Sequence, residues 1–382
     1  MASPTDWRSS LTASQRYDNV QRIQRALTGS SSSQSAFTVE NDAYKSSLNR
    51  EQYDAACDLH GNSVASVPPE PPEPSSSSIP ANDAIHAGGG TRIGLYRGCS
   101  YVASGVTAEV YRCQDRALKV IVETSNMEPH NPHREAKILQ LLKRPCIPLL
   151  ETFRDQEQRF VLVFPYMPLS LATLIEQGPL SYLQIRSIFT DLFTALTHIH
   201  TQGIIHRDIK PSAILLATPS GPAHLSDFGT AWHPTLSRAT EPPDRKILDI
   251  GTGAYRAPEA LFGDASYGPA VDMWAAGAAL AECLLRRPLF ESRAAHEDGS
   301  QLGLILSIFR TLGSPTRETW PEAVGLRTPP FEMYQVFEGR GWEEILPGVE
   351  PEWRELVAAL VRYGGGRATA EQALRYKCMQ QE

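Results

Sequence analysis

The 382-residue sequence predicts an α+β fold in which a strand-rich part precedes a mostly helical part. The pattern becomes strand-rich from about Arg92. A helical stretch follows at residues 183–201, where apolar residues recur at core spacing: Ile185, Ile188, Leu192, Leu196 and Ile199. Strands followed by helices along one chain are typical of this fold class. Residues 1 to about 90 differ in composition and form an N-terminal extension.

Composition indicates a soluble intracellular protein with room for one large domain or two smaller ones. The chain is 41% hydrophobic and 21% charged, with a net charge of -7. This acidic balance argues against direct nucleic-acid binding. We expect reduced thiols because the six cysteines are scattered without a C-x-x-C pair. We find no signal peptide and no membrane-spanning apolar run, so we expect the cytoplasm or nucleus.

The N-terminal extension is expected to be partly helical and partly disordered. Residues 1–62 contain two helical segments, at about 6–27 and 37–57, with apolar residues at helical spacing. Residues 63–91 form a linker rich in Pro, Ser and Gly. Residues 92–382 then form the main domain.

Two phrases in the extension resemble KIX-type domains, which are small helical modules that bind activation-domain helices. They are Asp6-Trp7-Arg8-Ser9-Ser10-Leu11-Thr12 and Val39-Glu40-Asn41-Asp42-Ala43-Tyr44 with Glu51-Gln52-Tyr53. The resemblance implies a transcription-factor peptide as partner. The alternative is a helical, partly disordered tail without such a partner.

The strongest motif lies in the main domain and is His206-Arg207-Asp208-Ile209-Lys210-Pro211-Ser212-Ala213. It resembles the catalytic loop of protein kinases, H-R-D-x-K-x-x-N. Phosphoryl transfer needs a carboxylate that orients the attacking hydroxyl and cations that neutralise the moving phosphate. The resemblance therefore implies Asp208 as base and Lys210 beside the γ-phosphate of ATP. Ala213 stands where the family has an Asn that holds one of two Mg²⁺ ions.

Upstream segments resemble the ATP-binding elements of the same family. In the glycine-rich loop, Gly105 keeps the middle glycine, and the other positions are Ala103, Ala108 and Val110. The run Arg116-Ala117-Leu118-Lys119 matches the strand that ends in the ATP-anchoring lysine. The resemblance implies that Lys119 binds the α- and β-phosphates of ATP and pairs with Glu135. Ala117 belongs to the same cofactor site.

The hinge between two lobes is expected at residues 165–168. The resemblance implies a bilobal fold with a β-rich N-lobe at 92–165 and a mostly helical C-lobe at 169–382. Phe164 takes the gatekeeper position, and backbone groups of Pro165 and Met167 would bond the adenine. Arg367 is expected to pair with Glu259.

The activation segment runs from the motif Asp227-Phe228-Gly229 to Ala257-Pro258-Glu259. By resemblance, Asp227 holds a Mg²⁺ ion, and Thr252 contacts both Asp208 and Lys210. Arg207 corresponds to the residue that usually binds an activating phosphate on this segment. The position phosphorylated in cyclin-dependent kinases falls on Ile247, which has no hydroxyl. The nearest hydroxyl and acidic candidates for supplying negative charge are Ser237, Thr240, Asp244 and Asp249.

These motifs span about residues 93–378, which resemble the branch of protein kinases that contains the cyclin-dependent kinases. The resemblance implies a serine/threonine protein kinase that uses ATP and Mg²⁺, with a protein as substrate. The segment before Glu135 lacks most of the cyclin-binding pattern, which puts a cyclin requirement in doubt. These features resemble the monomeric fungal kinases that phosphorylate cyclin-dependent kinases. A pseudokinase scaffold is the alternative, because Ala213 replaces the metal-binding Asn.

Overall fold

The structure is a computed structural model. It describes residues 50–61, 90–105, 107–122, 128–291, 301–326, 328–332 and 335–380, together with a few single residues before 50. The predicted helix at 6–27 lies largely outside the described residues, although Asn19, Arg22 and Ile23 are helical. The predicted linker at 63–91 also lies almost wholly outside them.

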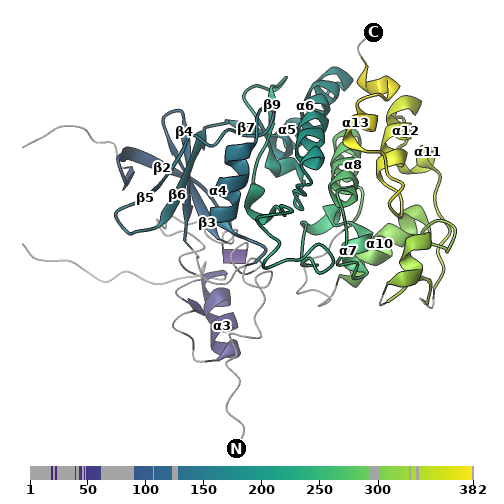
Figure 1. Cartoon of the computed structure of the whole chain (residues 1–382), viewed down its shortest axis with the longest axis horizontal. Coiled ribbons are helices and arrows are strands. Elements are labelled where there is room, and N and C mark those ends of the chain that lie inside the picture. The colour runs from purple at the N-terminus through teal and green to yellow at the C-terminus, as the bar shows by residue number, and fades with distance from the viewer. Residues whose placement is uncertain are drawn as a thin grey trace, which may run out of the picture.

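The strand-rich part forms one antiparallel six-stranded sheet at one end of the molecule (Figure 1). The strand order is β1-β2-β3-β4-β6-β5. The first strand begins at the last residue of the predicted linker. The bounds are β1 Thr91–Ile93, β2 Tyr96–Ser104, β3 Ala108–Cys113, β4 Arg116–Ile121, β5 Glu151–Arg154 and β6 Phe160–Pro165.

Alternation along β4 places its side chains on two different cores. Leu118 and Val120 are fully buried in a small cluster confined to the sheet. Ile121 faces the other way and joins the main core, which continues into the helical part. Lys119 is two residues from Ile121, so it lies on the face of the sheet that looks toward the helices.

One helix, α4 (Pro132–Leu141), packs with the sheet and carries Glu135. Its start follows the usual chemistry, because the Asn131 side chain accepts the N–H of Arg134 at 2.9 Å and Pro132 opens the first turn. The Asn131 N–H itself donates to the Gly229 carbonyl at 3.0 Å. The N-terminal end of α4 is therefore tied to the start of the activation segment.

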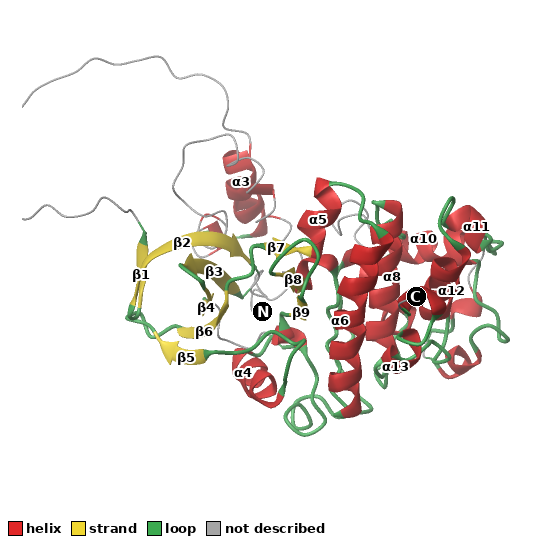
Figure 2. Cartoon of the chain, turned by 90° about the horizontal axis from the view of Figure 1, so that it is seen from above, coloured by secondary structure: helices red, strands yellow, loops and turns green. Residues whose placement is uncertain are grey.

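The second part of the chain is mostly helical and lies beside the sheet (Figure 2). A small sheet in the order β7-β8-β9 lies in it, with bounds Leu169–Ser170, Ile214–Leu216 and Ala223–Leu225. The α-helices are α5 Leu171–Gln177, α6 Tyr182–Thr201, α7 Pro258–Leu261, α8 Ala270–Leu285, α10 Leu302–Leu312, α11 Trp342–Ile345, α12 Pro351–Leu360 and α13 Ala370–Ala373. Short 3₁₀ turns are η2 Pro211–Ala213, η3 Phe228–Thr230, η4 Gly253–Tyr255, η5 Pro321–Gly325, η6 Pro330–Glu332 and η7 Lys377–Met379. The bilobal α+β fold is confirmed.

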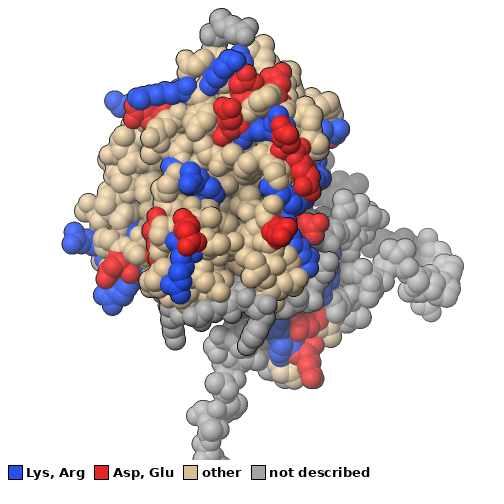
Figure 3. Space-filling model, turned by 90° about the vertical axis from the view of Figure 1, so that its right-hand side faces the viewer, with Lys and Arg blue, Asp and Glu red and all other residues tan. Residues whose placement is uncertain are grey.

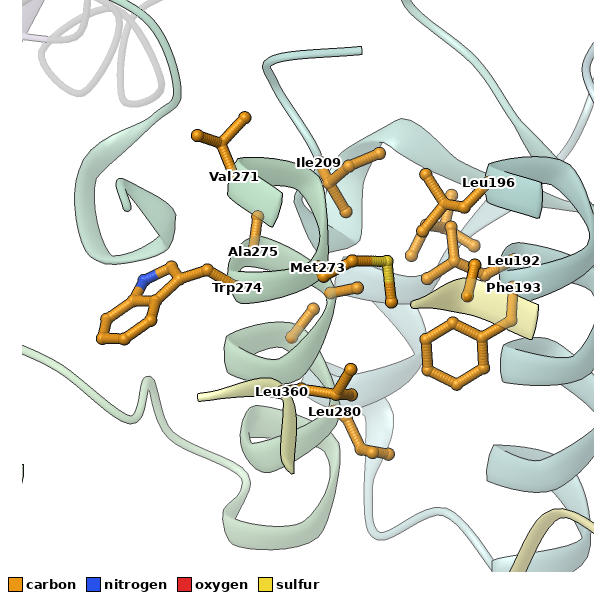
Figure 4. Close-up of a cluster of buried hydrophobic side chains, with 14 of the residues drawn as sticks. Leu192, Phe193, Leu196, Ile209, Val271, Met273, Trp274, Ala275, Leu280 and Leu360 are labelled. Atoms are coloured by element: carbon orange, nitrogen blue, oxygen red, sulfur yellow. The ribbon is translucent and has the colours of Figure 1, made fainter. Parts of the chain in front are cut away.

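The core of this part lies between α6 and α8 (Figure 4). All five residues that predicted a core helix are buried on α6. They pack with Met273 and Leu280 from α8 and with Leu360 from α12. Ile209 of the catalytic loop is 1% exposed and belongs to the same core, so the loop is anchored by apolar packing. This helical part also contains a buried ion pair, in which Arg367 Nη2 donates to Glu259 Oε2 at 2.8 Å, as predicted.

The extension contains helix α3 (Arg50–Gly61), which begins later than the predicted segment at 37–57. Val39, Ala43 and Tyr44 are helical, but Ser47 and Asn49 are not, so the predicted segment is interrupted. Asn49 Oδ1 accepts the N–H of Gln52 at 2.9 Å, which is how a capping side chain starts a new helix. The KIX resemblance of this region stays a prediction.

A small cluster joins these helical residues to the sheet. It contains Ile23, Val39, Ala43, Tyr53 and Cys57, and Val122, the residue after β4, packs against it. All six cysteines of the chain are buried and lack a disulfide bond.

Among the described helices, none combines the length and apolar character needed to cross a membrane. At the helical end of the molecule, Lys and Arg side chains are interspersed with Asp and Glu over the face seen in Figure 3.

Candidate active site

The three residues predicted to be catalytic come together from two distant segments. Lys210 Nζ donates to Asp208 Oδ2 at 2.5 Å, and Thr252 Oγ1 donates to Asp208 Oδ1 at 2.6 Å. Lys210 Nζ also lies 3.1 Å from Thr252 Oγ1. Both oxygens of the Asp208 carboxylate are thus held, which fixes its orientation. A fixed carboxylate beside a cation is what a base for a substrate hydroxyl requires.

A buried carboxylate from α8 supports the backbone of this loop. Asp272 accepts the N–H of His206 and the N–H of Arg207, each at 2.8 Å, and His200 Nε2 lies 2.9 Å from Oδ2. Arg207 has a φ of 72°, a left-handed conformation that side chains rarely adopt. The hydrogen bonds that Asp272 accepts from the two backbone N–H groups offset that strain. His206 Nε2 lies 2.9 Å from the Ser226 carbonyl, which joins the loop to the residue before Asp227.

A second group lies on the face of the sheet toward the helices. Lys119 Nζ is 2.8 Å from Glu135 Oε1 and 3.0 Å from Asp227 Oδ1. Burial lowers the pKa of Lys119, but the charges of Asp227 and Glu135 outweigh it and raise the pKa overall. Lys119 lowers the pKa of Asp227, despite the opposing effect of burial. Lys119 is therefore a permanent cation aimed at two carboxylates.

Strand register brings the remaining predicted ATP-site residues of the sheet to the same face. Ala103 pairs with Val110, Val110 with Lys119, and Ala117 with Phe164. Paired residues project on one side of a sheet, so all of them share the face of Lys119.

Ala103 and Ala108, which stand at two glycine positions of the glycine-rich loop, differ in their surroundings. Ala103 is exposed, whereas Ala108 is 5% exposed and packs in the main core. Between them, the Gly105 N–H donates to the Ala108 carbonyl at 2.8 Å and closes the turn.

The predicted hinge follows the end of β6. Pro165 is the last residue of β6. The N–H of the next residue, Tyr166, donates to the Asp115 carbonyl at 2.8 Å. Phe164 and Met167 are half-buried against the main core. Their contacts with adenine, and those of Pro165, stay predictions.

Asp227 fits a single divalent ion. It sits in a left-handed conformation with φ 63°, and its side chain is 47% exposed. Ala213 brings no ligand, because a methyl group cannot coordinate a metal and its carbonyl accepts both the N–H and the Oγ of Ser226. In the described part of the chain, no three His, Cys, Asp or Glu side chains gather as a metal site. Mg²⁺ commonly binds through one or two carboxylates plus substrate phosphates, which suits Asp227.

Glu241 in the activation segment was not among the residues predicted from the sequence. Arg207, expected to meet a phosphate, instead donates from Nη1 to Glu241 Oε2 at 2.5 Å and from Nη2 to Oε1 at 3.0 Å. Asp244 and Asp249, the acidic residues expected to supply negative charge to this segment, are both exposed, and Asp249 pairs with Arg256. Three carboxylates lie between Thr240 and Ile250 in the sequence, and nothing in the pattern marks the one that becomes buried.

Comparison with known proteins gives a consistent family. Residues 96–379 match the protein kinase domain family. The chain is 35% identical over 62% of its length to serine/threonine-protein kinase csk1 of Schizosaccharomyces pombe, covering 76% of that protein. It is 32% identical over 75% of its length to cyclin-dependent kinase 7 of Carassius auratus, covering 83% of it. It is 30% identical over 74% of its length to cyclin-dependent kinase F-3 of Oryza sativa, covering 64% of it.

The pseudokinase alternative is not supported, because the lysine, the glutamate and both aspartates that phosphoryl transfer needs are present and assembled. The chain therefore belongs to the protein kinase family and is a serine/threonine kinase of the cyclin-dependent-kinase-like branch.

Proposed function

We propose that this kinase phosphorylates the activation loop of a cyclin-dependent kinase and needs no cyclin of its own. The observation that carries the proposal is the Lys119–Glu135 pair at 2.8 Å, which protein kinases need for phosphoryl transfer. Contacts within the chain hold the helix that supplies Glu135, including the bond from Asn131 to Gly229. The resemblance to monomeric fungal kinases that activate cyclin-dependent kinases supports this substrate. The cytoplasm or nucleus is the expected compartment.

In the proposed reaction, Asp208 accepts the proton of the substrate Ser or Thr hydroxyl as that oxygen bonds to the γ-phosphorus. The bond from that phosphorus to the β-phosphate oxygen breaks, and ADP leaves. Lys210 neutralises charge on the transferred phosphoryl group, and Thr252 keeps the Asp208 carboxylate turned toward the hydroxyl. Lys119 binds the α- and β-phosphates of ATP and orients them for in-line transfer. Most of the rate enhancement then comes from positioning and charge.

Asp227 is the proposed ligand for Mg²⁺, together with phosphate oxygens of ATP. A bound divalent ion would neutralise charge that develops on the phosphates. Because Ala213 supplies no side-chain ligand, this chain would hold one protein-bound ion by Asp227 alone.

The substrate is tested by phosphate transfer to three acceptors under the same conditions. They are a catalytically inactive cyclin-dependent kinase without cyclin, the same protein with its activation-loop Thr changed to Ala, and a generic basic protein. We expect transfer to the first acceptor only, and no transfer by Asp208→Asn. Equal transfer to the first two acceptors would contradict the proposed site, and a need for added cyclin would contradict autonomy.

A further inference from the structure

A single carboxylate lies between two buried arginines that come from different lobes. Glu241 is bound bidentately by Arg207, at 2.5 and 3.0 Å, and its Oε1 lies 3.7 Å from Arg134 Nη1. The side chains of Glu241, Arg207 and Arg134 are 1%, 0% and 4% exposed. Bidentate carboxylate–guanidinium contacts in a buried site are strong and directional.

Each arginine is the chain neighbour of a residue in the active site. Arg207 precedes Asp208 in the catalytic loop, and Arg134 precedes Glu135 on α4. Asp208 is the proposed base, and Glu135 pairs with Lys119. The activation segment therefore reaches the catalytic loop and α4 through one side chain.

The position of Glu241 coincides with the place where a phosphate would bind. Its Oε2 accepts the N–H of Ile247 at 3.0 Å, and Ile247 is the residue at the position that is phosphorylated in cyclin-dependent kinases. A phosphate on this segment normally acts by pairing with arginines. Here Arg207 is already paired with Glu241, and Arg134 is shared between Glu241 at 3.7 Å and Glu128 at 3.0 Å.

The electrostatics of the group favour a permanent charge on Glu241. Burial by itself raises the pKa of this carboxyl. The hydrogen bond and the charge of Arg207 lower it, and so do the hydrogen bond from the Ile247 N–H and the charge of Arg134. Together they outweigh burial, so the pKa is lowered overall. The Glu241 backbone is also held, because its carbonyl accepts Trp232 Nε1–H at 3.0 Å.

We propose that Glu241 is a positioning residue that replaces an activating phosphate and keeps the catalytic loop and α4 aligned without phosphorylation. This inference rests on the proposed function. One candidate hydroxyl is already unsuited to phosphorylation, because Ser237 is fully buried and its Oγ accepts the His233 N–H at 3.0 Å.

The test compares wild type, Glu241→Gln, Glu241→Asp and Asp244→Asn, all freed of phosphate by phosphatase and checked by intact mass. The readout is kcat per nucleotide-binding site, measured beside KM for ATP, so that a smaller folded fraction does not count as lower activity. Glu241→Gln keeps the side-chain volume and removes the charge, and kcat should fall about 100-fold, as expected when reacting groups shift by about 1 Å. Glu241→Asp keeps the charge and should retain more kcat than Glu241→Gln. The exposed control Asp244→Asn should match wild type.

Two results would overturn this inference but leave the proposed function standing. One is a kcat for Glu241→Gln equal to that of Asp244→Asn. The other is a phosphatase-treated wild type that becomes active only after another kinase phosphorylates it, which remains decisive even if Glu241→Gln fails to fold. A wild type that transfers no phosphate in either form would overturn the proposed function as well.

Discussion

Asp272 shows how one buried side chain can fix a catalytic loop. Its carboxylate accepts two backbone N–H groups and lies against His200, while it is only 1% exposed. Buried donors that lose their acceptor incur the full desolvation penalty. An amide in place of the carboxylate can accept through one oxygen only, so one of these contacts would be lost.

We expect Asp272→Asn to lower the free energy of unfolding by about 1–3 kcal/mol at pH 7. Burial raises the pKa of Asp272, but the hydrogen bond and charge of His200, the charge of His206 and the Arg207 N–H lower it overall from 3.8. A lowered folded-state pKa gives stability that is present above pH 3.8 and is lost as pH falls through the folded value. The gap between wild type and variant should therefore narrow below that pH.

Denaturant unfolding from pH 7 to pH 3 measures this gap. Asp115→Asn is the matched control, because it removes a carboxylate whose side chain is 73% exposed. A gap for Asp272→Asn that stays constant with pH would contradict the assigned ionisation.

The residues that could be predicted from the sequence are those whose types the chemistry demands at fixed spacing. Lys119, Asp208 and Asp227 belong to this group. The structure places Lys119 beside Glu135 and Asp208 beside Lys210, the neighbours expected for them, whereas the contact of Asp227 with Lys119 was not predicted. Glu241 could not be predicted, because its role depends on a fold of the activation segment that buries one acidic side chain and leaves Asp244 exposed. The spacing of residues in that segment does not indicate which acidic side chain becomes buried.

Among the elements, α4 contributes to the site through its first turn. It carries Glu135 toward Lys119, and its first turn is fixed by Asn131 through a side-chain cap and a backbone bond to Gly229. The pairing of Glu135 with Lys119 could be predicted from the resemblance to the kinase motifs. The attachment of α4 to the activation segment is a contact between distant residues, which periodicity does not reveal. In the extension the difference is local, because the Asn49 side chain caps a new helix within the segment that was predicted to be one continuous helix.

Asn131→Ala should lower the free energy of unfolding by about 1 kcal/mol, the usual cost of a lost N-cap. Because the first turn of α4 also positions Glu135, KM for ATP should rise with it. Thr369→Ala is the matched control, since it removes the cap of α13, where Thr369 accepts the N–H of Gln372 at 3.2 Å far along the chain from α4. Unfolding curves and initial rates of both variants provide the comparison. An unchanged KM in Asn131→Ala would argue against coupling between the cap and the ATP site.

At the scale of the whole molecule, one continuous core joins the sheet to the helical part. It includes Ile121 and Leu162 from the sheet as well as α6, α8 and α12. The strand-then-helix order predicts the two parts, but their joint core depends on close contact between elements far apart in the sequence. Gly277 on α8 is such a contact, because an added Cβ would lie 2.6 Å from Leu360 Cβ on α12.

Gly277→Ala should lower the free energy of unfolding by about 1–3 kcal/mol, because α8 and α12 must separate to admit the methyl group. Gly268→Ala is the matched control, since a Cβ there meets no atom within 4 Å. Thermal unfolding of both variants measures the difference. Equal midpoints would mean that the two helices are less closely packed than described.

The purified chain alone should transfer the γ-phosphate of ATP when Mg²⁺ is present. Transfer by Asp208→Asn, compared at equal nucleotide occupancy, should be about 100-fold slower or more, as loss of a general base requires. Equal rates in the two proteins, with ATP bound in both, would mean that Asp208 is not the base.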